Sequence, residues 1–211
     1  WDTANVQDMR ALFKDAVAYN QPLNSWDVSN VTNMNGMFQN ATAFNQPLGN
    51  WDTSSVFRAT SMFENATSFD QPLNSWDTSG MGDTNYMFRG ATSFDQPLNQ
   101  WDMSNVTNMV NMFFGASSFD RSLGSWDISS VTQLGSILVG TNTSIANYDA
   151  TLIGWEALPN TPTGIVYQAQ GLTHCNADTA RSNLISVHGW LPGNFGDMRD
   201  CTNNPNNADH F

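Results

Sequence analysis

The sequence is poor in charge, and most of its charges have one sign. Charged residues make up 12% of the 211 residues, about half of the roughly 25% that is usual. Only 7 side chains are Lys or Arg against 19 Asp or Glu, so the net charge is −12. Because there is no basic run, binding to nucleic acid or to an anionic membrane surface is excluded. No apolar stretch approaches the ~20 residues that a membrane-spanning helix needs, so we expect no membrane insertion.

Motifs of catalysis and of metal binding are also missing. The sequence has no nucleophile elbow, zinc-peptidase motif, P-loop or dinucleotide-binding motif. Its 3 His residues lack the spacing of metal ligands. We therefore expect no enzymatic activity and no cofactor. The chain opens at Trp1 without an initiator Met or a leader, so we expect a mature product or a fragment whose signal peptide lies outside it.

What the sequence does contain is a repeat of 25 residues. Tryptophan recurs at this spacing without insertion, and an Asp follows each of the repeated Trp residues: Trp1, Trp26, Trp51, Trp76, Trp101 and Trp126. A Met-Phe pair, an Ala and an aromatic residue also recur in register, and most units close with Asn/Asp-Gln-Pro-Leu. A unit of this length cannot bury a core alone, so neighbouring units must stack.

One unit shows the expected local structure. The spacing of Leu23, Trp26 and Val28 is that of a leucine-rich-repeat strand. The apolar positions within residues 31–41 then recur at offsets of three and four, which predicts a short helix. The predicted fold is an α/β solenoid: a leucine-rich-repeat-like right-handed coil over residues 1–138, with one parallel β-sheet and short helices on the opposite face. A propeller blade needs more residues, and a β-helix lacks helical offsets.

The repeat resembles a family of bacterial surface proteins. The strings Phe44-Asn45-Gln46-Pro47-Leu48-Gly49-Asn50-Trp51-Asp52 and Val28-Ser29-Asn30-Val31-Thr32-Asn33-Met34 are similar to BspA-type leucine-rich repeats. More narrowly, they resemble a 25-residue class, long catalogued as a domain of unknown function, in bacterial and mycoplasma surface proteins. Residues 147–155, 171–175 and 189–190 resemble the C-terminal extension of the same proteins. The resemblance implies export, display at the cell surface, and adhesion or ligand binding.

Beyond residue 138 the repeat is lost, and residues 139–201 are expected to form a C-terminal capping region. We predict a helix from Asn147 that ends before Pro159, a strand over residues 164–167, and a second helix from Asn176 or Asp178 to Gly189. The polar residues 202–211 are predicted to be a linker or tail. The N-terminal end has no such cap, so we expect more repeats or a cap upstream.

Two cysteines, Cys175 and Cys201, lie in the capping region. Given the exported character that the resemblance implies, we expect them to form one disulfide. A bridge between them would close a loop of about 27 residues and stabilise the cap by a few kcal/mol. The alternative is two buried free thiols.

The Asp that follows each Trp is the main candidate for a binding site. If the strands stack in register, these carboxylates form a column at intervals of roughly 4.8 Å. Each Asp could accept a backbone N–H in an Asx-turn, the Asp side chains could bind Ca²⁺, or they could bind a cationic or polyhydroxyl ligand. The column, which we call the aspartate ladder, and the serines beside it comprise Asp27, Asp52, Asp77, Asp102, Asp127, Ser29, Ser54, Ser79, Ser104 and Ser129.

A second polar column, here called the return-loop ladder, comprises Asn20, Asn45, Asp70, Asp95 and Asp120. Polar columns of this kind satisfy the backbone of loops, so we predict a structural role for it.

For the whole domain we consider two functions: a monomeric extracellular module that recognises a protein or glycan at a cell surface, or a spacer that binds nothing. Residues beside the aspartate ladder are small and polar, whereas recognition surfaces usually carry aromatic residues or Arg.

Overall fold

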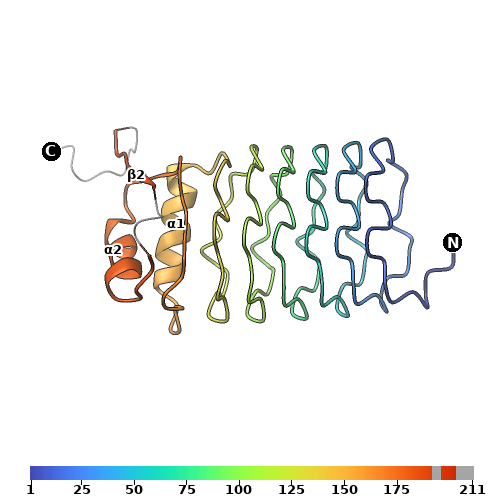
Figure 1. Cartoon of the computed structure of the whole chain (residues 1–211), viewed down its shortest axis with the longest axis horizontal. Helices are drawn as coiled ribbons and strands as arrows, with labels where there is room; N and C mark the ends of the chain where they lie inside the picture. The colour runs from blue at the N-terminus through green and yellow to red at the C-terminus, as the bar shows by residue number, and fades with distance from the viewer. Residues whose placement is uncertain (192–195, 203–211) are drawn as a thin grey trace.

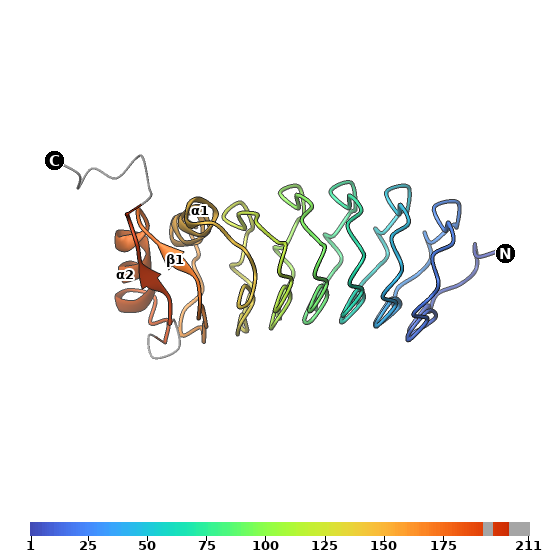
Figure 2. The ribbon, with the colours of Figure 1, turned by 90° about the horizontal axis from the view of Figure 1, so that it is seen from above.

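A computed structural model describes residues 1–191 and 196–202. The repeat units form coils that stand side by side in one row, and the C-terminal segment covers one end of the row (Figure 1). That segment contains, in chain order, α1 (Ile145–Glu156), β1 (Thr173–His174), α2 (Asp178–Ser186) and β2 (Met198–Arg199). Helix α1 stands next to the last coil, and α2 lies at the far end of the row (Figure 2). Of the predicted tail, residues 203–211 lie outside the described residues.

Hydrogen bonds between backbones hold each coil to the next. The N–H groups of Met9 and Ala11 donate to the carbonyl oxygens of Asn33 and Asn35, at 2.9 and 3.0 Å, and the same pattern recurs along the row. Within this pattern one residue per coil forms a parallel β-bridge: Asp8, Asn33, Arg58, Asp83, Asn108 and Gln133. Because equivalent residues pair at a spacing of 25, side chains at the same repeat position form columns across the row.

The short helices predicted within the coils are wrong. After the β-bridge at Asn33, residues 34–41 form successive turns, in which, for example, the N–H of Met37 donates to the carbonyl of Met34 at 3.1 Å. The third residue of this turn, Gly36, has φ +61°, and Asn40 in the next turn has φ +60°. Such left-handed residues suit turns and interrupt an α-helix. In each turn an N–H donates to the carbonyl three residues earlier, so a run of such turns buries residues at offsets of three and four. The sequence analysis interpreted this pattern as a helix.

The strand predicted over residues 23–28 is also wrong, because this segment is built from turns. The N–H of Trp26 donates to the carbonyl of Leu23 at 3.0 Å, and that of Val31 donates to Val28 at 2.9 Å. Parallel pairing exists, but it involves the segment that begins at Asn33 in this unit and not the predicted strand. The assignment to the leucine-rich-repeat class and the right-handed coil stay predictions.

Columns of aromatic side chains fill the coils. Phe38 stacks on Phe63 at a centroid distance of 5.5 Å, and Trp51 stacks on Trp76 at 6.3 Å. The indole Nε1 of Trp51 also donates to the carbonyl of Leu23 at 3.0 Å, a bond that recurs in the next three units. The four repeated Trp residues from Trp51 to Trp126 therefore contribute both buried apolar area and a satisfied polar atom to the contact between coils.

The C-terminal segment continues this packing with regular elements. Helix α1 begins at Ile145, two residues before the predicted start, and α2 begins at Asp178, one of the two predicted starts. Residues 164–167 do not form the predicted strand, although Tyr167 makes a parallel bridge to Gly135. The predicted disulfide between Cys175 and Cys201 is present. Within the described residues no helix is long and apolar enough to span a membrane.

Candidate functional site

Each carboxylate of the aspartate ladder binds its own turn. The Oδ1 atom of Asp77 accepts the N–H of Ser79 at 3.0 Å and its hydroxyl at 2.6 Å. The equivalent carboxylates at Asp27, Asp52 and Asp102 make the same pair of bonds. Asp127 accepts the N–H of Ser129 at 2.9 Å. This is the geometry of an Asx-turn, in which the carboxylate caps the backbone two residues on.

The same bonds favour the charged form of these side chains. Hydrogen bonds from the Ser79 hydroxyl and then from its N–H lower the pKa of Asp77, and the negative charge of Asp102 opposes this only weakly. The pKa values of Asp27 and Asp102 are lowered by the corresponding serine bonds. All five carboxylates of the ladder are exposed. Among residues 1–191 and 196–202 there is no group of three or more His, Cys, Asp or Glu side chains that could hold a metal ion.

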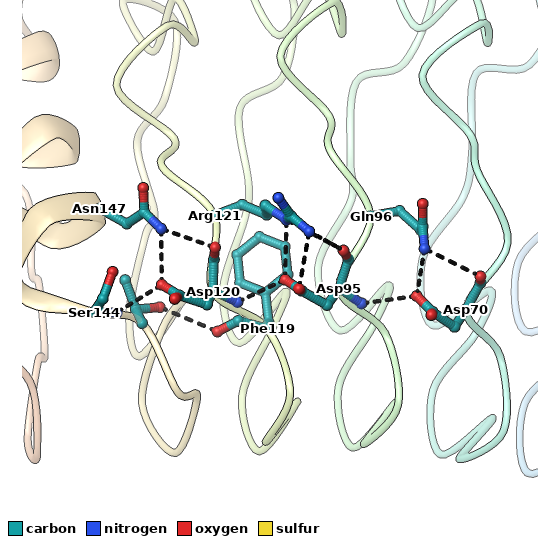
Figure 3. A network of polar contacts seen from close by, with 9 residues as sticks. Asp70, Asp95, Gln96, Phe119, Asp120, Arg121, Ser144 and Asn147 are labelled. Atoms are coloured by element: carbon teal, nitrogen blue, oxygen red, sulfur yellow. Dashed lines mark hydrogen bonds and ion pairs between the residues drawn. The ribbon is translucent and has the colours of Figure 1, made fainter.

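The return-loop ladder connects the coils and ends on α1 (Figure 3). In each step a side-chain oxygen accepts the N–H of the equivalent residue in the next coil; Asp70 accepts that of Asp95 at 3.0 Å, and Asp95 that of Asp120 at 2.8 Å. At the end of the row, Oδ1 of Asp120 accepts the N–H of Ser144 at 2.7 Å and the side-chain amide of Asn147 at 2.8 Å. Asp120 thus fastens the last coil to the start of α1.

Arg121 takes the place that Gln occupies in the earlier units of this ladder. Its Nη2 lies 2.9 Å from Oδ2 of Asp95, whereas Gln96 donates to Oδ1 of Asp70 at the same distance. Burial would raise the pKa of Asp120, but its bonds from Ser144 and Asn147 outweigh that effect and lower it. The polar side-chain atoms of the return-loop ladder thus bind other groups of the protein. The ladder links the coils and has few hydrogen-bonding atoms left for a ligand.

A charged cluster lies inside the C-terminal segment around Asp197, whose carboxylate is fully buried. Arg181 contacts both of its oxygens at 3.0 Å or less, and the Tyr148 hydroxyl donates to Oδ2 at 3.0 Å. Nδ1 of His174 lies 3.4 Å from the same oxygen. Burial alone would raise the pKa of Asp197, but the bonds from His174, Arg181 and Tyr148 lower it to about 2. The cluster fixes the segment that carries β2 against α1 and α2.

Aromatic side chains and an arginine that are at least partly exposed lie together on the central coils, and the sequence pattern did not predict them. Cζ of Arg89 lies 5.7 Å from the ring centres of both Tyr86 and Phe114. We call these three residues the Arg89 patch. Nη1 of Arg89 lies 2.9 Å from the nearly buried carboxylate of Glu64, and Gln39 donates to the same carboxylate at 2.7 Å. The arginine is thereby held in place while its side chain stays 44% exposed.

A further aromatic side chain, Phe57, is 56% exposed in the preceding coil. A methyl group at Gly82 would lie 3.0 Å from the Phe57 ring, so the absence of a side chain there lets the ring lie on the next coil. The sequence held a signal for these residues, because their repeat positions vary from unit to unit. The position of Phe57 is Gln, Thr or Gly in the other units, and that of Phe114 is Lys, Gln, Glu, Arg or Val.

Comparisons with known proteins give one match. No curated protein and no solved structure matches the chain. A family model matches residues 1–96 and again residues 48–151, so its two matches cover the repeated coils and most of α1. The family is described as Mycoplasma protein of unknown function, DUF285, and the chain belongs to it.

Proposed function

We propose that this chain is an extracellular, BspA-like surface module that recognises a protein ligand without catalysis, through the exposed face of its central coils. The observation that carries the proposal is the Arg89 patch with Phe57. Aromatic residues and Arg are the residue types enriched in binding hot spots. In the aspartate ladder, by contrast, the carboxylates are engaged by their own turns.

The geometry of the patch suits recognition because its side chains are already held in place before a ligand binds. Arg89 is fixed by Glu64 and by the two rings beside it, and Phe114 stays 37% exposed. The coils beneath are held by backbone hydrogen bonds on both sides. A binding surface that is rigid before the encounter loses less side-chain entropy in the complex.

An extracellular location is supported by the disulfide between Cys175 and Cys201, since disulfides persist mainly in oxidising compartments. It is also the location implied by the resemblance to BspA-type surface proteins. The alternative function is a spacer that displays another adhesive domain. The regularity of the coils and the small polar residues of most exposed columns favour that alternative.

The test is binding of the purified chain to an array of extracellular-matrix and cell-surface proteins. The repeat itself supplies variants that should fold: Phe57→Thr, Arg89→Gln and Phe114→Gln each introduce a residue that stands at the same position in another unit. We expect each to weaken binding by about tenfold or more, as loss of a hot-spot residue does. The control is Val187→Ser, which removes a side chain that is 69% exposed at the end of α2.

Binding that is lost in the three patch variants and kept in the control supports the proposal. If no protein on the array binds, the spacer function is favoured. If the patch variants bind as the parent chain does, recognition uses another face and the assignment to the central coils is wrong.

A further inference from the structure

A groove lies at the junction between the last coil and the C-terminal segment. One wall is formed by residues 129–132 and the other by residues 160–163 together with Ile165, around a volume of about 520 Å³. We call it the junction groove. The chain has 26 formal charges at neutral pH, from 7 basic and 19 acidic side chains, but none of the described residues that line the groove has an ionisable side chain. Its polar lining consists of hydroxyl, amide and backbone groups.

Comparison with the other coils shows hydrogen-bonding capacity that the groove leaves unused. In the four preceding units the ladder serine donates its hydroxyl to Asp at 2.6 Å. Within the part of the chain that the structure describes, Ser129 donates only its N–H. In the coil before, the carbonyl of Thr107 accepts the N–H of Thr132 at 2.9 Å. Among the described residues, no N–H donates in turn to the carbonyl of Thr132.

The two walls are fixed from behind. The Thr132 hydroxyl donates to the carbonyl of Thr107 at 3.1 Å, and Asp127 holds the turn at Ser129. Across the groove, the carbonyl of Pro162 accepts the indole N–H of Trp190 at 2.8 Å. The N–H of Gly164 donates to His188 at 2.9 Å. The groove is therefore formed before any ligand arrives, which is the usual condition of a small-molecule site.

The chemistry of the lining selects one class of ligand. Hydroxyl groups both donate and accept, the Asn160 amide does the same, and a backbone carbonyl only accepts. A ligand that satisfies them must present several donors and acceptors without net charge. The buried side chains of Val131 and Ile165 lie in the lining as well, and they suit a ligand with apolar C–H faces. Saccharides combine these properties.

We propose that the junction groove binds a neutral saccharide. The site is separate from the Arg89 patch and does not depend on the proposed recognition of a protein. Hydrogen bonds would come from Ser129, Asn160 and Thr163 side chains and from the backbone of residue 132. The groove takes the ligand because the repeat ends there: among the described residues, the Ser129 hydroxyl and the carbonyl of residue 132 have no hydrogen-bond partner in the segment that follows.

The test is a titration of the ¹⁵N-labelled 211-residue chain with maltose, lactose and N,N′-diacetylchitobiose, followed by amide chemical shifts. We expect at least one of these neutral sugars to shift the amides of residues 129–132 and 160–165. Ser129→Ala, Asn160→Ala and Thr163→Ala should each weaken that binding about threefold to tenfold, the effect of losing one hydrogen bond. Ser54→Ala is the matched control, because Ser54 occupies the repeat position of Ser129 but donates to Asp52.

Three outcomes would overturn the proposal. The first is that none of the three sugars shifts the groove amides at tens of millimolar. The second is that glucuronic acid or glucosamine shifts the same amides at lower concentration than the neutral sugars do. The third is that the groove variants bind as tightly as Ser54→Ala does, with spectra that show all of them to be folded. Each result is independent of whether the Arg89 patch binds a protein.

Discussion

Replacing Gly154 by Ala tests whether α1 docks on the coils as the structure describes. In an isolated helix this change is favourable by about 1 kcal/mol, because Ala has the higher helix propensity. In the folded chain a methyl at residue 154 would lie 2.6 Å from both the Cα and the C atom of Gly124, and closer still to its carbonyl oxygen. Contacts this short with backbone force the helix away from the coil.

The expected size follows from these two opposing effects. Overpacking against a rigid neighbour costs about 1–3 kcal/mol, and the gain in propensity offsets about 1 kcal/mol of it. We therefore expect a net loss of up to about 2 kcal/mol where propensity alone predicts a gain. The loss should be local, because the bonds at risk are those of Thr151 and Trp155 to the backbone of Leu123, at 2.9 and 3.0 Å.

Urea unfolding and hydrogen exchange measure the effect. The midpoint should fall, and amides of α1 and residues 157–191 should exchange faster while those of residues 26–100 change little, since stacked repeats couple mainly to their neighbours. Ala146→Gly, at an exposed position in the first turn of α1, is the control that measures propensity alone. A higher midpoint in Gly154→Ala would refute the close approach of the two glycines.

Three further changes test other parts of the molecule. Asp77→Asn should hardly change stability, because an amide oxygen can still accept from Ser79, whereas Asp77→Ala should cost about 0.5–1 kcal/mol; a melting temperature that rises with Ca²⁺ and loses this rise in Asp77→Asn would contradict the Asx-turn account. Cys201→Ser should destabilise the C-terminal segment by about 3.5 kcal/mol, because the disulfide closes a loop between cysteines that are 26 positions apart, and equal loss of exchange protection over residues 26–125 would argue against it. Because the folded pKa of Asp197 is lowered to about 2, its stabilisation is complete above its unfolded pKa near 4 and should be lost between about pH 4 and 2; Asp197→Asn should remove this acid-dependent step, and an unchanged acid transition would show that other groups control it.

The period and the interior could be predicted from the sequence because both depend on residues repeated in every unit. A Trp or Phe at fixed register must be buried against its counterpart in the next unit, and the stacking of Phe38 on Phe63 follows directly. The helices of the C-terminal segment could be predicted because they are local: their hydrogen bonds join residues four apart. The disulfide was predicted from cysteine count and from the family resemblance.

The structure within each coil could not be predicted in the same way, because its hydrogen bonds join residues in different units. Offsets of three and four fit both an α-helix and a run of turns. The choice depends on Met34, whose N–H donates to Arg58 in the next coil at 2.8 Å instead of to its own segment. A strand pattern is a spacing of residues within one segment and carries no information on pairing between units. It therefore predicted the parallel pairing at residues 23–28, whereas the β-bridge lies at Asn33.

The two candidate sites in the coils differ in whether their residues are repeated in every unit. The aspartate ladder stands out in the sequence because it is present in every unit, and the structure shows that each Asp binds its own turn. The Arg89 patch arises at positions that differ between units. A search that aligns the six units and asks where one unit alone carries an aromatic residue would have found Phe57, Tyr86 and Phe114, and Arg89 stands at the repeat position of Phe114.

The tryptophan bonds show why departures from the repeat are the places to look for function. The bond from Trp Nε1 to a carbonyl in an earlier coil continues beyond the repeat, from Trp155 to Leu123 at 3.0 Å and from Trp190 to Pro162 at 2.8 Å. The C-terminal segment therefore preserves the packing of the coils even where its sequence no longer matches them. Residues that are the same in every unit are needed for this packing, so substitutions there would damage the fold. The Arg89 patch lies at positions free of that requirement, where side chains can change without loss of the stack. The junction groove lies where the repeat ends, so its second wall, residues 160–163, belongs to no repeat unit.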